Sequence, residues 1–466
     1  MRNTRLWAGL VSLLVLAGCA SAPNYDAKVA HTQDYLAGLR FEASSTTNEQ
    51  TRWWETLNDA QLNRLVEQAH LVNLDLQATD RRLQEALAQL GVSESERLPQ
   101  GGGVGEYSVT DRDDERLESA RAGAQITWEL DLFGRIRSVI DAREAGVASA
   151  EALDRAALKE VTVGVIQAYL RWESSRQQVA LIESDLEALD ASLKLVRNRV
   201  EAGLSPRLDL ARAETLYHQQ RVLLPVARNN QFRTRASLAV LLGQDPDDLS
   251  LTAAPATLKQ ARALPVGDEP GLALQSRADI AAALASLAQA AALSEAAVSD
   301  LYPQVTVEGF AGFSNIEGVG DGFEDTLSAI PRISWAVLSY PALLKQVEVQ
   351  EARTEAQYVA YRKTVVEAVG QARVVADRFS RTEQSERASA RALEASRVAF
   401  NTSESLYREG AIGYLDYLDA NREWIAAQRA HLNAQFDLAD SRLGLLRAFS
   451  GLWSHSLYRQ IRETGA

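Results

Sequence analysis

The sequence is poor in residues that form cross-links and metal sites. Its 466 residues include a single cysteine, so no disulfide can form within the chain. The five histidines are scattered singly, and none lies at the spacing that zinc sites need. A net charge of −13 argues against a nucleic-acid-binding protein, which usually carries a basic face. We therefore expect no metal, no other cofactor and no nucleic-acid partner.

The single cysteine, Cys19, follows a short leader. Two arginines begin the leader, and the apolar run at residues 6–15 is too short to cross a bilayer. The run leads into Leu-Ala-Gly-Cys, which resembles a bacterial lipoprotein signal, so residues 1–18 are predicted to be removed and Cys19 to carry a covalent lipid. Ala20 stands where an aspartate would favour the inner membrane, so the outer membrane is favoured. The alternative is an ordinary signal peptide cut near Ala20 or Ala22. After the leader we expect no apolar run of the length of a transmembrane helix.

The rest of the chain contains two copies of one unit. Gly203 matches Gly410, and Asp209 matches Asp416, both at a spacing of 207 residues (416 − 209). Such spacing recurs along the whole length, which indicates a tandem structural repeat. The predicted organisation is an N-terminal segment 19–59, a first copy 60–250, a proline-containing linker 251–272, a second copy 273–453 and a C-terminal tail 454–466.

Each copy is predicted to contain a helix, two strands, a very long helix and a medium helix. The leading helices are expected at residues 60–95 and 274–298. The long helices are expected at residues 138–201 and 345–408, each about 95 Å long at about 1.5 Å per residue. Apolar residues between 186 and 200 follow the 3-4 spacing of a coiled coil. The chain is therefore expected to be mainly α-helical.

Between these helices, alternating stretches predict membrane strands. Residues 120–130, 305–314 and 327–337 alternate apolar with polar side chains, apart from Phe310, while the remaining stretch is glycine-rich and alternates poorly. The strands should pair into hairpins at about residues 99–130 and about residues 303–337. Strands of about ten residues have the length found in membrane β-barrels.

Three residues at these strands carry specific expectations. Trp128 and Trp335 stand at equivalent strand ends, where an aromatic girdle would meet lipid headgroups. Pro331 lacks a backbone donor, so we expect a bulge or a local bend there.

Four strands cannot form a closed barrel, which needs about eight. An open edge in lipid would leave backbone groups unpaired, so strands from several chains must combine. Three chains would supply about twelve strands, enough for a pore, and long helices enough for a tube. The sequence therefore predicts a homotrimer in which two hairpin tips of each chain surround one opening.

No arrangement of residues typical of an enzyme stands out. The glycine clusters at residues 101–105 and 318–322 lack the Gly-Lys-Ser/Thr ending of a phosphate-binding loop, and neither begins a helix. No Ser-His-Asp, Cys-His or paired-carboxylate set is apparent. We expect a protein that is not an enzyme.

Four motifs in order carry a family resemblance. They are WWETLND (residues 53–59), NLDL (73–76), WELDLFGRIRS (128–138) and YREGAIGYLDYLDANR (407–422). With these motifs the chain resembles the lipoprotein branch of the TolC-like outer membrane factors, the OprM/NodT type. The resemblance implies a homotrimer with a twelve-stranded outer-membrane β-barrel, a periplasmic α-barrel and an equatorial belt that includes residues 19–59. It also implies a passive exit duct for drugs, toxic compounds or metals, joined to an inner-membrane pump by a periplasmic adaptor.

The resemblance also implies a periplasmic gate at the hairpin tips. Asp416 and Asp419 match gate aspartates, which in three copies would form a carboxylate ring that attracts cations. Asp209 matches a partner acid, and Tyr407 matches a tyrosine that ties neighbouring hairpins. A plain alternative is that acids favour helix N-termini.

The tip loops are the expected contacts with the adaptor, unless they are only polar turns. One gate arginine of the family is replaced here by Ile412, and Arg207 was considered as its substitute. The loop residues expected to touch the adaptor are Gly203, Leu204, Ser205, Arg207, Gly410, Ile412 and Gly413.

Two other functions remain open from the sequence. Within the same class, the channel could export proteins or peptides instead of small molecules. From another class, the chain could be a lipid-anchored periplasmic coiled-coil scaffold without a pore. The alternating strands with terminal tryptophans argue against the scaffold.

Overall fold

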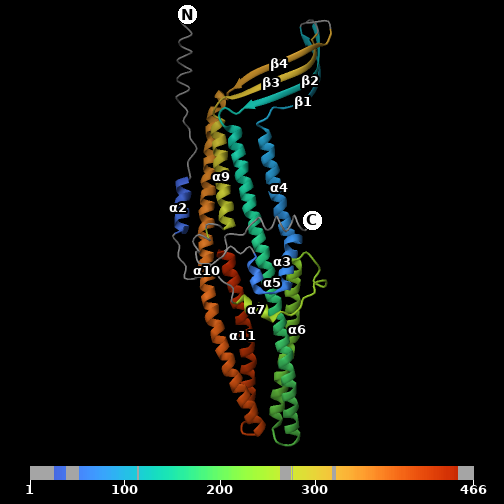
Figure 1. Ribbon diagram of the computed structural model, residues 1–466, viewed down its shortest axis with the longest axis vertical. Coiled ribbons are helices and arrows are strands. Elements are labelled where there is room, and N and C mark those ends of the chain that lie inside the picture. Colours follow the sequence, from blue (N-terminus) through green and yellow to red (C-terminus); the bar gives the residue numbers. More distant parts are fainter. Residues whose placement is uncertain are drawn as a thin grey trace. The chain divides into compact units, whose positions relative to one another are not determined.

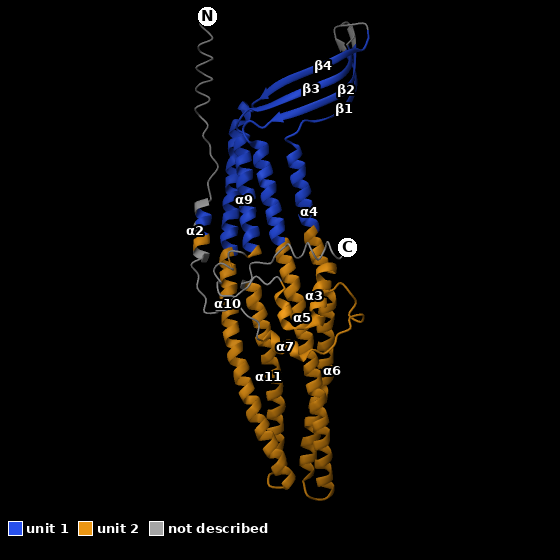
Figure 2. Cartoon of the chain, in the orientation of Figure 1, with its two compact units in different colours: residues 1–32, 81–153, 279–364 blue, residues 33–80, 154–278, 365–466 orange. Residues whose placement is uncertain are grey.

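A computed structural model describes residues 26–37, 52–112, 115–262, 274, 277–316 and 322–449 (Figure 1). Cys19, the predicted leader and the tail 454–466 lie outside these residues. The described chain is mostly helical and contains one four-stranded antiparallel sheet, which confirms the expected fold class at that level. Two compact units are distinguished in Figure 2. Unit 1 comprises residues 1–32, 81–153 and 279–364, and unit 2 comprises residues 33–80, 154–278 and 365–466.

The sheet of unit 1 combines one strand pair from each predicted copy. Its order is β1-β2-β3-β4, and all neighbours are antiparallel. The strands are longer than expected, and β4 ends before Trp335, because residues 337–339 form a short 3-10 turn, η2. The bounds are Gln100–Arg112 for β1, Glu115–Leu130 for β2, Gln304–Ile316 for β3 and Glu324–Ser334 for β4.

Pro331 does not produce the bulge that we expected. It pairs with Val307 in a register that continues unbroken from Gln304 and Ser334 to Ser314 and Glu324. The reason is position: β4 is an edge strand of this sheet, and an edge strand tolerates a residue without a backbone donor.

Phe310, which interrupted the predicted alternation, lies beside a glycine of β2. Gly123 and Gly312 stand directly opposite each other in the β2–β3 register. A Cβ on Gly123 would lie 2.4 Å from the carbonyl oxygen of Ala311 and 3.0 Å from the Phe310 ring. The two glycines therefore permit a close approach of β2 and β3, and the Phe310 ring covers Gly123.

Four helices accompany the sheet in unit 1, three of them only in part. They are the end of α4 (Leu74–Ser95), the start of α5 (Arg135–Glu201), α9 (Ala278–Ser299) and the start of α10 (Tyr340–Glu409). Another helix, α2 (Asp26–Ala37), contacts α10 through Lys28, whose Nζ lies 3.2 Å from Glu355 Oε2.

Helix α9 corrects one expectation. By length and composition it could cross a membrane, so our prediction that no such run follows the leader was wrong. The helix is rich in alanine, and a third of its apolar window is buried. Ser149 of α5 donates to the Ala282 carbonyl, and Thr354 of α10 donates to the Ala290 carbonyl. Helix α9 therefore contacts both α5 and α10 within unit 1.

Unit 2 holds the remaining helices. They include η1 (Trp53–Leu57), α3 (Ala60–Val72), α6 (Arg207–Leu241), α7 (Pro255–Ala261) and α11 (Tyr414–Phe449). The rest of α5 and α10 pass through it, so that α5–α6 and α10–α11 form two hairpins (Figure 2). A core of fully buried side chains joins these elements, among them Trp54, Leu57, Leu62, Val66, Ile166, Tyr169, Leu170 and Leu238.

The predicted leading helix at residues 60–95 is two helices. Asn73 adopts an extended conformation between α3 and α4. Its Oδ1 accepts hydrogen bonds from the backbone of Asp75 at 3.0 Å and of Leu76 at 3.1 Å. A side-chain acceptor for the first free amides is what begins a new helix, so Asn73 both ends α3 and caps α4.

The predicted linker 251–272 also contains a helix. Its residues 255–261 form α7, which starts with Pro255 at the first helical position. Thr257, Leu258 and Ala261 of this helix are buried in the core of unit 2. The segment therefore contributes to packing as well as joining the two copies.

Candidate functional site

The sheet of unit 1 has one apolar face and one polar face. The register places residues that lie directly opposite each other on the same face. The apolar face carries Ala120, Ala122, Ala124, Ile126, Trp128, Leu130, Val305, Val307, Ala311, Phe313, Leu327, Ala329 and Ile333, with Glu118, Asn315 and Asp325 as polar exceptions toward the β1–β2 and β3–β4 turns. The polar face carries Glu106, Ser108, Arg121, Gln125, Thr127, Glu129, Thr306, Glu308, Ser314, Thr326, Ser328 and Arg332, with Val104, Phe310 and Ile330 as apolar exceptions.

The apolar face is not covered by other parts of unit 1. Leu327 is 87% exposed and Ile333 is 72% exposed. Contiguous exposed apolar surface is uncommon in proteins surrounded by water and marks a face that meets lipid or another apolar surface. The length of the strands and the exposed apolar face of the sheet are therefore both suited to a membrane.

The polar face is held by pairs of side chains across neighbouring strands. Arg121 Nε donates to Glu106 across 2.6 Å, and Arg332 Nη2 donates to Glu308 across 3.1 Å. The guanidinium of Arg121 also lies over the Phe310 ring, 5.8 Å from its centre. These charged groups pair with one another while remaining open to water.

The two tryptophans predicted for an aromatic girdle make equivalent hydrogen bonds. Trp128 Nε1 donates to the carbonyl of Arg97 across 2.9 Å, and Trp335 Nε1 donates to the carbonyl of Leu301 across 3.1 Å. Each indole thus ties a strand end to the backbone just after the preceding helix, while 39% and 40% of the two residues stay exposed. Their place at a lipid boundary stays a prediction.

The hairpin tips of unit 2 repeat one capping motif. Gly203 and Gly410 have φ values of 73° and 75°, in the left-handed region that favours glycine. After Gly203, the amide of Leu204 donates to the carbonyl of Arg199, and after Gly410 that of Ala411 donates to Leu406. Both long helices therefore end in the same glycine-based cap, which explains why the sequence repeats glycine at a spacing of 207 residues.

One apolar cluster joins the two tips. Three tyrosines lie at its centre: the rings of Tyr407 and Tyr417 stack with centres 5.3 Å apart, and Tyr414 lies 5.6 Å from Tyr407. Burial raises the pKa of all three hydroxyls, so they remain uncharged at neutral pH. The cluster contains Leu189, Leu193, Val196, Ala213 and Leu216 from the first hairpin and Tyr407, Tyr414, Tyr417, Leu418 and Ile425 from the second.

The predicted gate acids occupy different environments. Asp416 and Asp419 are exposed on α11, where Asp419 lies 4.0 Å from Arg422. Asp209 is buried, and its carboxylate lies 3.8 Å from Arg212 on the same helix. Asp209 is thus buried within the chain, whereas the side chains of Asp416 and Asp419 are exposed and accessible to another surface.

The predicted adaptor-contact residues lie at the two loop ends. Leu204 is 69% exposed. Gly203, Arg207, Gly410 and Gly413 are also exposed, whereas Ser205 and Ile412 are half-buried. The exposed glycines and leucine leave apolar and backbone surface available at both tips.

The arginine that contacts Tyr407 is Arg199, which was not among the residues predicted from the sequence. Arg199 Nη1 donates to the Tyr407 carbonyl oxygen across 3.1 Å. Arg207, considered from the sequence, stands exposed at the start of α6. The repeat offered no signal for this contact, since the residue equivalent to Arg199 in the second copy is Leu406 (406 − 199 = 207).

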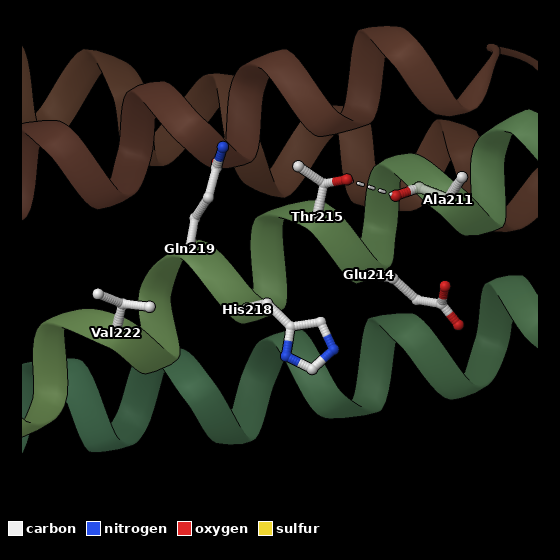
Figure 3. Close-up of a pocket in the computed structure, with 6 residues that line it drawn as sticks. All are labelled: Ala211, Glu214, Thr215, His218, Gln219 and Val222. Carbon is white, nitrogen blue, oxygen red and sulfur yellow. Dashed lines mark hydrogen bonds between the residues drawn. The ribbon is translucent and has the colours of Figure 1, made fainter.

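A shallow groove of about 590 Å³ runs along α6 (Figure 3). Its lining comes from this one helix, so no polar groups from a second element converge there on a ligand. Within the residues that the structure describes, no group of three or more histidine, cysteine or acidic side chains could hold a metal ion. The lining residues are Ala211, Glu214, Thr215, His218, Gln219 and Val222.

Comparison with known proteins identifies the family. The model described as "Outer membrane efflux protein" matches residues 65–244 and 270–451, most of the chain. The chain belongs to this family of outer membrane efflux proteins. The outer membrane protein OprJ of Pseudomonas aeruginosa is 27% identical over 98% of this chain and 98% of its own length. The solvent efflux pump outer membrane protein SrpC of Pseudomonas putida is 27% identical over 96% and 98%.

A solved structure agrees with the fold of this efflux protein. The outer-membrane channel OprN superposes with a TM-score of 0.81 at 27% identity, over 93% of this chain and 97% of its own. The resemblance predicted from the sequence is therefore confirmed, and so is location in the outer membrane.

Proposed function

We propose that this efflux protein supplies one third of a trimeric channel through the outer membrane. The observation that carries the proposal is the sheet: it has an apolar face, a polar face and two outer strands that pair on one side only. An unpaired strand edge in hydrocarbon costs several kcal/mol for each backbone group. Three copies joined edge to edge would provide about twelve strands, with the apolar faces toward lipid and the polar faces toward a lumen.

The α5–α6 and α10–α11 hairpins would extend this channel as a periplasmic tunnel. Three chains would bring six hairpin tips around one opening. The exposed loop residues, Leu204 among them, are the proposed contacts with a periplasmic adaptor, which links the channel to an inner-membrane pump. The channel itself is then a passive exit duct and needs no catalytic residue.

We propose that the acids at the tips form the gate of this tunnel. Asp416 and Asp419 are exposed in the first turns of α11, so three chains could place them around the opening. A ring of carboxylates attracts cations and resists anions. Tyr407 lies in the apolar cluster that joins the tips, and Asp209 is buried at the start of α6, so both would support the tips from within.

We also propose that Cys19 anchors the mature chain through a covalent lipid, and that the cargo consists of small molecules. A covalent lipid attaches a chain to the membrane without spanning it, so the anchor would supplement the barrel and not replace it. The relative SrpC is named as part of a solvent efflux pump, which supports small organic molecules as the cargo proposed for this chain.

The experiment combines mass with conductance. Detergent-extracted protein should have three times the subunit mass, and it should conduct ions after reconstitution into a planar bilayer. Leu327→Lys, on the apolar face, should reduce the amount of trimer, whereas Ser328→Lys, on the polar face, should preserve it. A protein with the mass of one subunit and no conductance would contradict the channel and favour the scaffold.

A further inference from the structure

One arginine joins the two hairpin tips of each chain. Arg199 lies in the last turn of α5, and Tyr407 lies in the last turn of α10. Arg199 Nη1 donates to the Tyr407 carbonyl oxygen across 3.1 Å, and its guanidinium carbon lies 4.8 Å from the centre of the Tyr407 ring. A single side chain from the first hairpin therefore holds both the backbone and the ring of a residue in the second hairpin.

The carbonyl that Arg199 contacts belongs to a helix end. The last four carbonyls of a helix have no partner within the helix, and they carry its negative partial charge. The Tyr407 carbonyl accepts one hydrogen bond from the amide of Gly410, across 3.1 Å, and the second from Arg199. The arginine thus caps α10 from the neighbouring hairpin and places its positive charge where the helix favours it.

Other ion pairs that the structure describes at the tips lie within one hairpin. Arg197 pairs with Glu214 between α5 and α6 of the first hairpin. Arg408 pairs with Glu404 along α10 at 2.7 Å. These pairs can persist when the hairpins separate, whereas the contacts of Arg199 cannot.

We propose that Arg199 is a positioning residue of the gate, which latches the second hairpin to the first within each chain. The inference rests on the proposed channel function. Separation of the tips must break the hydrogen bond to the Tyr407 carbonyl and the contact with its ring. These two contacts then act together with the apolar cluster of the tips to oppose opening. Since the second copy has Leu406 at the equivalent position, the latch exists once in each chain.

The test compares two arginines that lie close together. Arg199→Gln removes the latch, whereas Arg408→Gln removes the same charge beside Tyr407 from a pair that lies within α10. In planar bilayers we expect Arg199→Gln to lower the closed-to-open ratio about tenfold, which corresponds to about 1.4 kcal/mol. Arg408→Gln should leave the ratio at the wild-type value.

A second variant separates gating from folding. Arg199→Lys keeps the charge but lacks the planar fork that can reach the carbonyl and cover the ring, so its ratio should fall between wild type and Arg199→Gln. The thermal midpoint is measured for every variant. If Arg199→Gln does not assemble, the closed-to-open ratio of Arg199→Lys is compared with that of Arg408→Gln. A lower ratio for Arg199→Lys supports the latch, and equal ratios contradict it.

The outcomes separate the two proposals. A conducting wild type in which the position-199 variants gate like Arg408→Gln overturns the latch alone. A lowered thermal midpoint with an unchanged closed-to-open ratio also overturns it, because Arg199 would then serve only stability. A wild-type protein that forms no channel would contradict the proposed function, and it would therefore also contradict the role of Arg199 in a gate.

Discussion

The hydroxyl of Tyr169 donates a hydrogen bond across 2.9 Å to the carboxylate of Asp59, 110 residues earlier in the chain. Thr257 donates to the same oxygen across 2.6 Å. The other carboxylate oxygen accepts from the backbone amides of Gln61 and Leu62 and so caps α3. One buried carboxylate thereby joins α3, α5 and α7, and burial with this hydrogen bond raises the pKa of Tyr169.

Asp59→Asn should destabilise unit 2. The amide can still cap α3, but its NH2 group cannot accept the two hydroxyl hydrogen bonds. We expect a loss of about 1–3 kcal/mol, measured as the urea midpoint of the circular dichroism signal in detergent. Glu187→Gln, at an exposed position of α5, is the control and should change stability by less than about 0.5 kcal/mol. Equal midpoints for the two variants would mean that the hydrogen bonds contribute nothing.

Adjacent residues of β4 should respond in opposite ways to a new charge. Leu327→Lys places an ammonium group on the apolar face, which costs about 2–4 kcal/mol at the centre of a bilayer. Ser328→Lys places the same group on the polar face, where water can reach it. We expect the heat-sensitive gel mobility of folded protein in outer-membrane fractions to be lost only in the first variant. If both variants insert equally well, the assignment of the two faces is wrong.

The acids at the tips should control conductance. Replacing Asp416 and Asp419 together with alanine removes the proposed carboxylate ring, so single-channel conductance should rise and block by multivalent cations should weaken. Glu409→Ala removes an exposed acid at the end of α10 and serves as the control. Conductance and cation block that match the control would show that the two aspartates only favour the start of α11.

Asp185 should make stability depend on pH. Its carboxyl is buried and lies 3.9 Å from Arg429, and burial raises its pKa from 3.8 to about 6 despite that cation. Since the folded chain binds this proton more tightly than the unfolded chain, the charged carboxylate destabilises the fold above pH 6. This penalty fades as the pH falls from above 6 toward 4.

Asp185→Asn provides the measurement. Asparagine does not titrate, so wild type should gain about 1–3 kcal/mol relative to the variant as the pH falls from 8 to about 4. Comparing the two proteins at each pH cancels other groups such as His70, whose pKa burial lowers to about 4. A constant difference across this range would show that Asp185 has an ordinary pKa.

Periodicity predicted much of this fold, because long helices and alternating strands repeat their signal over many residues. The predicted helix at residues 138–201 corresponds to α5, and the predicted tip glycines take the left-handed conformation. The division at Asn73 could also have been predicted, since an asparagine before Leu74 and Asp75 is typical of a helix start.

Other features depend on packing between distant parts of the chain. Nothing near Thr257 indicates that its hydroxyl meets Asp59, and nothing near Arg199 indicates that it meets a carbonyl 208 residues away. Phe310 broke the alternation of its strand because its ring covers Gly123 on another strand. Such contacts depend on how distant parts of the chain pack together, so the residue pattern around each position does not predict them.

The outer strands of the sheet have a consequence for biogenesis. Within the described chain, β1 and β4 each pair with one neighbour only, so a newly exported polypeptide has two strand edges without a hydrogen-bonding neighbour. In the proposed trimer, the time before these strand edges pair with those of other chains depends on how many copies of the chain are present. Slow synthesis therefore prolongs the period in which a periplasmic chaperone or a protease can capture the exposed strands.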